Sequence, residues 1–315
     1  MKSDNTMKKD IKCSNLNISG ELSSIKSNKV SQYLFGNKVV LRDSQYLYWT
    51  SKNRVNIDAW VCGDRNVNNI GDLLSIVIVD YLLKENNIDI NCQTNKTRHL
   101  YAIGSILLGF QDSVIWGSGF GRDISKDKFL KLYKAIHRTR HRVDIRALRG
   151  PETLRIIKEM IPSHKLSNTR FGDPACLLPL YYKKAPKGTK EFIVVPHYSQ
   201  YEKYCKKYDA IGTFTSDWKD FVEKILEAKL VISSSLHGII IAEVYGIPAV
   251  MLRDSSSGDI TKFKDWYYTT ERYNFPIAHT VEEAKKIKPL LLDNKVLEKM
   301  QKDLIASFPA DLWRQ

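Results

Sequence analysis

Residues 229–251 restrict the possible fold more than any other part of the sequence. This stretch contains two short apolar runs with a polar turn between them, composed of three serines, a leucine, a histidine and a glycine. A buried strand, a turn, a short helix and a second buried strand are typical of a parallel α/β sheet, in which Gly246 and Pro248 would end the helix. We therefore predict half of a Rossmann-type repeat, with the polar turn at the carboxyl end of a strand, where ligands bind in such sheets.

The polar turn is a candidate anion site. Free backbone N–H groups and the helix dipole both favour negative charge at a helix start. Ser233, Ser234 and Ser235 add hydroxyl donors, and we expect His237 at the mouth of the site. The alternative is structural, because a serine often only caps a helix and a lone histidine is often structural. A cap needs one residue, so capping alone does not account for the whole turn.

Length and composition restrict the class of protein. A chain of 315 residues suits two domains. No segment reaches the ~18 apolar residues of a membrane span, and the N-terminus lacks the apolar core of a signal peptide, so we expect a cytoplasmic protein. The five cysteines are widely spaced, with no C-x-x-C pair, which predicts reduced thiols rather than disulfides or a zinc site.

The net charge of +14 is concentrated in residues 122–149, where ten Lys or Arg face three Asp. Such a segment attracts anions: nucleic acid, an anionic membrane surface or a phosphorylated small molecule. The alternative is a solvated helix face, since Phe129, Leu132, Tyr133 and Ile136 give the segment an apolar side. A nucleic-acid module would need aromatic residues interleaved with the charges, and the two present lie at core spacing. We therefore predict no nucleic-acid partner.

The order of apolar and polar segments predicts four regions. Residues 1–32 form a polar leader, 33–183 an N-terminal Rossmann-like domain, 184–280 a second one, and 281–315 a charged helical tail whose apolar end, 308–313, is expected to pack on the body. Two Rossmann-like domains facing each other across a cleft resemble the two-domain glycosyltransferase fold called GT-B. Strands are expected at residues 56–62, 100–103, 113–116, 144–147 and 191–195.

Five short motifs, in this order, resemble the polysaccharide pyruvyl transferase family. The resemblance covers residues 56–268, about two thirds of the chain, and its specificity comes from the order and spacing of the motifs. The motifs are Asn69-x-Gly71-Asp72, Trp116-Gly117-Ser118-Gly119, Arg146-x-x-Arg149-Gly150-Pro151, Gly172-Asp173-Pro174-Ala175 and Ser235-Leu236-His237-Gly238.

The resemblance implies a GT-B-like fold and a reaction. Members of the family transfer pyruvate from phosphoenolpyruvate to two hydroxyls of a sugar, forming a pyruvate ketal and releasing phosphate. An arginine and a histidine that match Arg149 and His237 are implicated in binding the donor. The family often carries Asp after that arginine, whereas this chain has Gly150, which puts in doubt any role of that carboxylate.

Phosphoenolpyruvate carries a carboxylate and a phosphate, so its site needs donors for both. Arg149 suits the carboxylate and the turn suits the phosphate, although the two could be exchanged. His237 could deliver a proton or stabilise the leaving phosphate. The donor-binding residues expected beside them are Ser234, Ser235, Leu236, Gly238 and His197.

Other residues are assigned to the acceptor side of the cleft. Asp72 and Asp173 are candidate bases for a sugar hydroxyl, with a helix cap and a turn as their respective alternatives. Trp266 could present a face to a sugar, although core packing is the alternative. No metal-ligand spacing is present, and we expect no cofactor beside the co-substrate phosphoenolpyruvate. The remaining acceptor-side or cleft residues are Asn69, Gly71 and Ser118.

A second enzyme class stays open: a GT-B glycosyltransferase that uses a nucleotide-sugar. Glu243 could contact a ribose in such an enzyme, but position 251 is Met rather than a second Glu. Release of a nucleoside diphosphate instead of phosphate would distinguish the two. For the pyruvyl transferase we expect a sugar acceptor, lipid-linked, with peripheral contact to the inner membrane surface.

Overall fold

The computed structural model describes most of the chain beyond residue 38. The described residues are 39–41, 47–49, 52–59, 61–62, 67–107, 113–122, 143–160, 166, 169–215 and 217–314. The predicted leader and residues 123–142 of the basic segment lie outside them.

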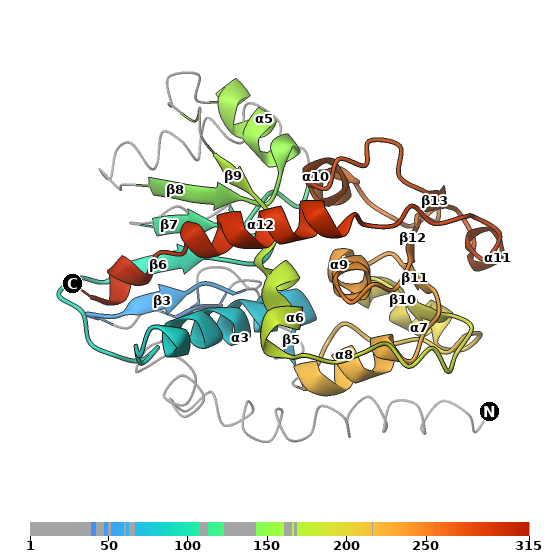
Figure 1. Ribbon diagram of the computed structural model, residues 1–315, viewed down its shortest axis with the longest axis horizontal. Helices are drawn as coiled ribbons and strands as arrows, with labels where there is room; N and C mark the ends of the chain where they lie inside the picture. Colours follow the sequence, from blue (N-terminus) through green and yellow to red (C-terminus); the bar gives the residue numbers. More distant parts are fainter. Residues whose placement is uncertain are drawn as a thin grey trace.

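The first half contains a five-stranded parallel sheet in the order β3-β6-β7-β8-β9 (Figure 1). Its helices are α3 (Ile70–Glu85) and α5 (Pro151–Met160), followed by the short η2 (Pro174–Leu177) and α6 (Leu178–Tyr181). The parallel order confirms the predicted α/β class. The strands are β3 (Val55–Ile57), β6 (Arg98–Tyr101), β7 (Ser113–Trp116), β8 (Val143–Leu148) and β9 (Arg170–Phe171).

The strand predicted over residues 56–62 is two separate strands. β3 ends at Ile57, and β4 (Val61–Cys62) pairs antiparallel with β5 (Val67–Asn68). At the end of β3 the buried carboxylate of Asp58 lies 3.1 Å from Nδ1 of His99. The backbone N–H of Asp58 donates to Leu100 O. A second antiparallel pair joins β1 (Val39–Leu41) and β2 (Leu47–Trp49).

The second half contains a four-stranded parallel sheet in the order β10-β11-β12-β13. The prediction for residues 229–251 is confirmed: β11 leads through the serine turn into α9, and α9 into β12. Gly246, with a φ of 79°, follows α9 in a conformation that favours glycine. The strands are β10 (Ile193–Val195), β11 (Val231–Ser233), β12 (Ala249–Leu252) and β13 (Ile277–Ala278). The helices are η3 (Tyr198–Gln200), α7 (Tyr201–Tyr204), α8 (Trp218–Leu226), α9 (Leu236–Val244), α10 (Thr261–Thr269) and α11 (Val281–Ala284).

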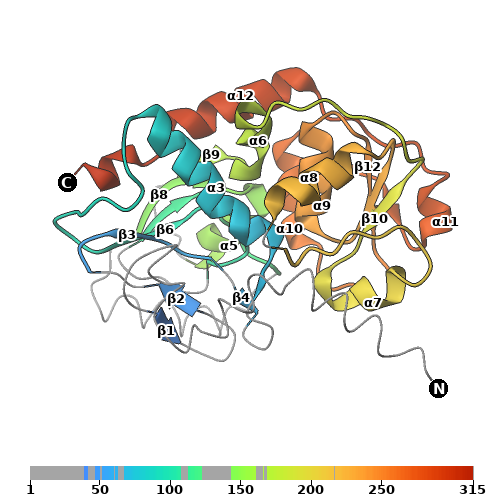
Figure 2. The same ribbon diagram turned by 90° about the horizontal axis from the view of Figure 1, so that it is seen from below.

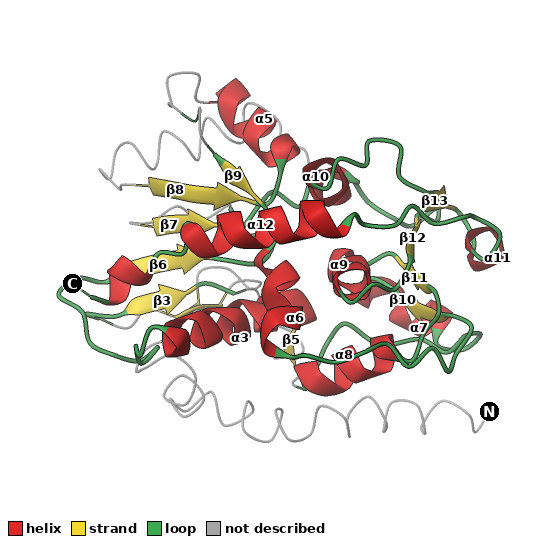
Figure 3. Cartoon of the chain, viewed as in Figure 1, coloured by secondary structure: helices red, strands yellow, loops and turns green. Residues whose placement is uncertain are grey.

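The C-terminal segment returns from the second half to the first sheet (Figures 1 and 3). The indole N–H of Trp116 donates to Leu304 O of helix α12 (Asn294–Ala306), over 3.0 Å. The ring centroids of Phe308 and Trp116 lie 5.1 Å apart. Trp313, in η4 (Ala310–Trp313), donates from its indole N–H to Ile90 O. The predicted packing of residues 308–313 on the body is therefore confirmed.

One apolar cluster joins the two halves. It includes Leu74 and Ile78 of α3, Ile239 and Ile241 of α9, and Leu304 of α12. Helices α8 and α9 of the second half lie beside α3 and α6 of the first (Figure 2). The halves therefore meet through packed helices, which fixes the loops at the strand ends relative to one another. The GT-B-like arrangement remains a prediction. In the part of the chain that the structure describes, no helix is long and apolar enough to span a bilayer.

Candidate active site

Two adjoining cavities lie where loops from the carboxyl ends of both sheets meet. The α9 cavity, of about 270 Å³, lies between the starts of α3 and α9, and the β12-loop cavity, of about 250 Å³, lies beside the serine-rich loop after β12. His197 and Lys262 line both, so the two form one continuous candidate site. The α9 cavity is lined by Asn69, Asp72, Gly104, Ser105, Ile106, His197, Tyr198, Ser235, Leu236, His237 and Lys262. The β12-loop cavity is lined by Gly121, Arg122, His197, Ser199, Gln200, Ser234, Met251, Leu252, Ser256, Ser257, Gly258, Asp259, Lys262 and Phe263.

His237, the second residue of α9, extends from the second half onto the first. Its side chain is 10% exposed, and its Nε2 lies 3.4 Å from Oδ2 of the fully buried Asp173. That distance is within ion-pair range, but neither atom makes a hydrogen bond within the described part of the chain. Buried polar atoms without partners are costly and concentrate at functional sites. Asp173 therefore lies behind His237, and it does not line either cavity.

Gly71 gives the imidazole its place. A Cβ at this position would overlap the ring of His237, coming within 2.8 Å of Nε2 and closer still to Cε1 and Nδ1. Gly71 is the second residue of α3, whose N-cap is Asn69. The glycine thus permits the α3 start and the α9 start to approach closely enough to hold the ring between them.

Gly71→Ala is expected to lower turnover by at least about tenfold, because the added methyl group displaces the ring of His237 from its position. Steady-state kinetics of the folded variant measure this loss. In a His237→Ala background the same substitution should cost little further activity, since the ring is absent. Equal losses in both backgrounds would contradict the contact as the cause.

The serines of the turn have different tasks. Ser233 Oγ lies 2.7 Å from Val195 O and accepts from Ser235 N, and Ser234 Oγ donates to Gln200 Oε1 while accepting from His197 N. These two hydroxyls hold the turn. Ser235 is the N-cap of α9 but makes no side-chain cap bond, and it lines the α9 cavity. Ser235 is therefore the serine whose hydroxyl is best placed for a ligand.

The first turn of α9 supplies further donors. As at any helix start, the N–H groups of Leu236, His237 and Gly238 have no intrahelical acceptor. Gly238 packs its Cα against Ser233 Oγ and Val195, where a Cβ would come within 2.7 Å of Cγ1 of that valine. This close packing holds the helix start against the end of β10, so its positive dipole end faces the α9 cavity.

Lys262 is the cation shared by both cavities, and the sequence interpretation missed it. It lies half-buried at the start of α10, and among the described residues no carboxylate pairs with it. Burial, and then the positive charge of Arg149, lower the pKa of Lys262 to about 8. Arg122 adds an exposed positive charge to the β12-loop cavity. The sequence feature that could have identified Lys262 is its position just beyond the loop that follows β12, at the ligand-binding edge of the sheet.

His197 lines both cavities as a neutral imidazole. It is the N-cap of η3, and its Nδ1 lies 2.8 Å from Ser199 Oγ. Burial, followed by the positive charge of Lys262, lowers the pKa of His197 to about 4. At pH 7 it can therefore form hydrogen bonds with a ligand but does not bring a charge to the site.

Asp72 is the carboxylate of the α9 cavity. It occupies the third position of α3 and is 7% exposed. The alternative role of helix cap belongs instead to Asn69, whose side chain accepts from Gly71 N and lies 3.4 Å from the hydroxyl of Thr213. Asn69 thus links the two halves at the cavity, and Asp72 lines the same cavity.

Arg149 does not reach either cavity. Its guanidinium is fully buried, lies 3.1 Å from Asp265 Oδ2, and also donates to Ser105 Oγ and Phe120 O. The position of Arg149 does not support the predicted contact with the donor carboxylate, because its guanidinium is buried and paired with Asp265 of α10. A Cβ on Gly150 would lie 2.5 Å from Asp265 O, so there is no room here for the carboxylate that the family often carries. Arg149 joins α10 to the first half, and it adjoins the site through Ser105, which lines the α9 cavity, and through its charge near Lys262.

Three other residues predicted to contact a ligand, Trp266, Glu243 and Ser118, are also buried. The indole of Trp266 is 0% exposed and donates to Glu243 Oε2, so it cannot present a face to a sugar. Glu243 pairs with Arg272 at 2.6 Å, which removes it as a ribose contact. Ser118 is fully buried and donates to Gly104 O. Among the residues that the structure describes, no group of three or more His, Cys, Asp or Glu is placed to hold a metal ion.

Comparison with known proteins identifies the family. The family model for polysaccharide pyruvyl transferases matches residues 59–256 of the sequence. The chain therefore belongs to the polysaccharide pyruvyl transferase family, a class of transferase enzymes.

Two individual proteins are also similar. An uncharacterized protein of Acanthamoeba polyphaga mimivirus is 27% identical over 219 residues, which are 63% of this chain and 69% of the relative. The crystal structure of an uncharacterized protein of Klebsiella pneumoniae subsp. pneumoniae NTUH-K2044 aligns over 73% of this chain and 94% of its own, with a TM-score of 0.46 and 15% identity.

Proposed function

We propose that this protein transfers pyruvate from phosphoenolpyruvate to two hydroxyls of a sugar, forming a pyruvate ketal and releasing phosphate. One observation carries the proposal. An imidazole, an ammonium group without a paired carboxylate among the described residues, and a helix start meet at adjoining cavities in a chain of the pyruvyl transferase family. These are the groups that a small carboxylated phosphate ester needs.

The donor has a place for each of its anionic groups. Its phosphate fits the start of α9, where Ser235 and the free N–H groups of the first turn donate. Its carboxylate fits Lys262, with Arg122 nearby in the β12-loop cavity. Lys262 thus takes the role that the family resemblance assigned to Arg149. The reverse orientation would use the same groups.

The chemistry requires one acid and one base. The methylene carbon of phosphoenolpyruvate gains a proton and becomes a methyl group, and a sugar hydroxyl attacks the neighbouring carbon while losing its proton. The bond from that carbon to the phosphate oxygen then breaks, and the second hydroxyl attacks and gives up its proton, which the phosphate carries away. His237 delivers the first proton or stabilises the leaving phosphate, and Asp72 accepts the hydroxyl proton.

Asp173 acts through His237. Its Oδ1 accepts from Ala175 N over 3.0 Å, which leaves Oδ2 facing the imidazole. A carboxylate held in this way fixes the orientation of the ring, as the buried carboxylate does in other histidine-containing sites. We therefore assign Asp173 a positioning role rather than the role of base.

The acceptor is a sugar of a polysaccharide or of a lipid-linked oligosaccharide at the inner membrane surface. The predicted cytoplasmic location and the predicted membrane contact belong to this proposal. The basic segment that would support the membrane contact falls largely on residues 123–142, outside the described residues.

A turnover assay tests the proposal. The protein is incubated with phosphoenolpyruvate and a panel of methyl galactosides, glucosides and mannosides, and the products are analysed by mass spectrometry and by phosphate release. The expected product is a cyclic pyruvate ketal, formed with one phosphate for each sugar modified. Release of a nucleoside diphosphate from a nucleotide-sugar, with no reaction of phosphoenolpyruvate, would instead identify a glycosyltransferase.

The affinity for phosphoenolpyruvate is expected to fall as the pH rises through about 8. The pKa of Lys262 is lowered to about 8, so its positive charge is present below that pH and lost above it. Because the site needs this charge to bind a carboxylate, the Kd should rise about tenfold between pH 7 and pH 9.5. Titration calorimetry across this range measures the change.

Lys262→Arg is the matched control for this pH dependence. Arginine stays charged throughout the range, so its Kd should be nearly constant with pH. Lys262→Met should bind weakly at every pH, because it has no charge to lose. A wild-type fall in affinity that persists unchanged in Lys262→Met would assign the titration to a different group.

A further inference from the structure

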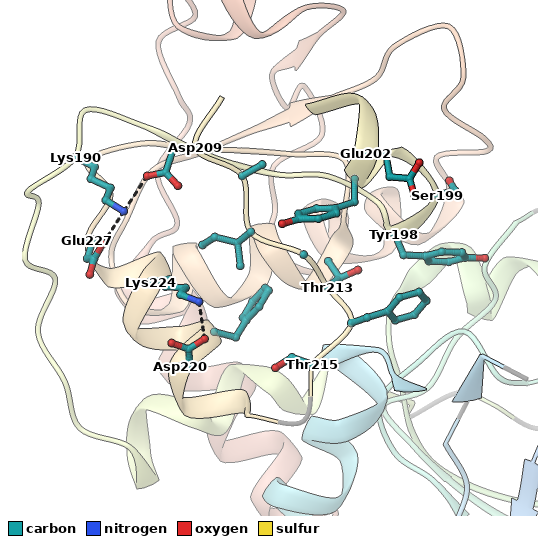
Figure 4. A pocket seen from close by; sticks show the side chains of 16 residues that line it. Lys190, Tyr198, Ser199, Glu202, Asp209, Thr213, Thr215, Asp220, Lys224 and Glu227 are labelled. Carbon is teal, nitrogen blue, oxygen red and sulfur yellow. Dashed lines mark hydrogen bonds and ion pairs between the residues drawn. The ribbon is translucent and has the colours of Figure 1, made fainter. Parts of the chain in front are cut away.

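A third and larger cavity opens beside the candidate active site (Figure 4). We call it the α8 cavity. Its volume is about 620 Å³, within the ~300–1,000 Å³ of small-molecule sites. It lies between α7, α8 and the loop 209–215 of the second half. Its lining residues are Lys190, Tyr198, Ser199, Tyr201, Glu202, Asp209, Ala210, Ile211, Gly212, Thr213, Phe214, Thr215, Asp220, Phe221, Lys224 and Glu227.

The charges of the α8 cavity disfavour an anionic ligand. Its lining has two lysines and four carboxylates. Lys190 pairs with Asp209 and Glu227 at 2.8 Å each, and Lys224 pairs with Asp220 at 2.7 Å, as Figure 4 shows. Neither lysine is therefore left to bind a phosphate or a carboxylate. The donor, which carries both, belongs to the two cavities that contain Lys262.

The uncharged part of the lining suits a neutral polyhydroxylated ligand. Aromatic rings line it from α7, α8 and the loop 209–215, and the ring of Tyr201 covers the backbone at Gly212. The hydroxyls of Ser199 and Thr215 and the carboxylate of Glu202 add hydrogen-bonding groups. Apolar ring faces next to a few hydroxyl and carboxylate groups match a sugar, which has apolar C–H faces and hydroxyls that both donate and accept.

The α8 cavity leads to the candidate active site through two residues. Tyr198 lines both the α8 cavity and the α9 cavity, and Ser199 lines both the α8 cavity and the β12-loop cavity. The ring centroid of Tyr198 lies 4.1 Å from that of His197 and 4.9 Å from that of Phe214. A ligand in the α8 cavity therefore adjoins the region where His197 and His237 meet the donor.

We propose that the α8 cavity is the acceptor subsite, which binds a neutral sugar unit next to the two hydroxyls that become bridged. This inference rests on the proposed function, because the terms acceptor and donor come from the proposed transfer of pyruvate. It assigns the neutral acceptor to the α8 cavity and the anionic donor to the two cavities that contain Lys262. It replaces Trp266, which is buried, with Tyr201 and Phe214 as the aromatic residues near the acceptor.

Two variants test the subsite by different physical changes. Tyr201→Ala removes an aromatic face, and Gly212→Leu fills the cavity. The Cβ of the latter has only ordinary contacts of 3.4–3.6 Å with the ring of Tyr201. Each should raise the KM for the methyl glycoside that serves as acceptor about tenfold, while the KM for phosphoenolpyruvate changes less than about twofold. Tyr201→Phe, which keeps the ring, should stay near the wild-type value.

The matched control is Tyr273→Ala, which removes an aromatic ring that is 65% exposed and lines none of the three cavities. It should leave both KM values unchanged. Thermal melting of every variant shows which of them are folded, and Gly212→Leu remains informative if Tyr201→Ala is not. Unchanged acceptor KM values in the folded variants, or a parallel rise in the KM for phosphoenolpyruvate, would overturn the subsite.

Hydrogen exchange separates failure of this inference from failure of the proposed function. Methyl glycosides alone should slow backbone exchange in residues 198–215 of the wild-type protein but not of Gly212→Leu. Phosphoenolpyruvate alone should slow exchange in residues 233–240 and 256–263. Glycoside protection of residues 198–215 supports the subsite even if no ketal is formed, and the absence of such protection overturns it even if ketal is formed.

Discussion

His237→Gln is expected to lower the rate of ketal formation by about 10²–10⁴-fold, the usual contribution of a positioned acid or base. The KM for phosphoenolpyruvate should change much less, because Lys262, Ser235 and the start of α9 still bind the anionic groups. Glutamine keeps a polar side chain between Gly71 and Asp173, so the fold should survive. Single-turnover kinetics, with circular dichroism as a check of folding, measure the effect.

Two further variants show how His237 works. Asp173→Asn should also slow turnover, by a smaller factor, because the asparagine keeps the shape but not the charge that faces Nε2. His279→Gln is the matched control: His279 bonds to Arg253 O and lines none of the three cavities, so full activity is expected. A folded His237→Gln enzyme with wild-type turnover would remove His237 from the chemistry.

Arg149→Ala is expected to lower the free energy of unfolding by about 3–5 kcal/mol. The substitution leaves the fully buried carboxylate of Asp265 without its charged partner. An unpaired buried charge destabilises the folded state strongly. Asp265 also accepts from the hydroxyl and N–H of Thr153, so the loss would loosen the contact between α5 and α10. Urea denaturation followed by circular dichroism measures this change.

A surface arginine is the matched control. Arg146→Ala breaks the pairs with Asp144 and Asp311, whose carboxylates are about half exposed, and should cost no more than about 1 kcal/mol. The double variant Arg149→Met, Asp265→Asn should recover part of the loss, because it leaves no buried charge unpaired. If Arg149→Ala is as stable as the wild type but no longer binds phosphoenolpyruvate, Arg149 is a donor ligand after all.

The α/β class and the position of the serine turn could be predicted from the sequence, and the reason is local. In residues 229–251 the order of apolar runs, serine turn and glycine fixes a strand, a helix start and a second strand, and the structure has all of them. The turn had to lie at the carboxyl edge of a parallel sheet, whatever the rest of the chain did. Its residues Ser235, Leu236 and His237 do line the α9 cavity.

Which charged and aromatic residues reach that cavity depends on tertiary contacts. Arg149 lies just before the start of α5 and Lys262 lies in the first turn of α10, so the sequence places both cations near a helix start. Their roles follow from contacts between segments distant in sequence: Asp265 of α10 binds Arg149 in the interior, while Lys262, one turn earlier on α10, lies at the cavities. Trp266 lies on the same helix and is buried against α9, where its indole donates to Glu243. A sequence pattern sets which face of an element is apolar, but burial and pairing depend on which other element packs against it.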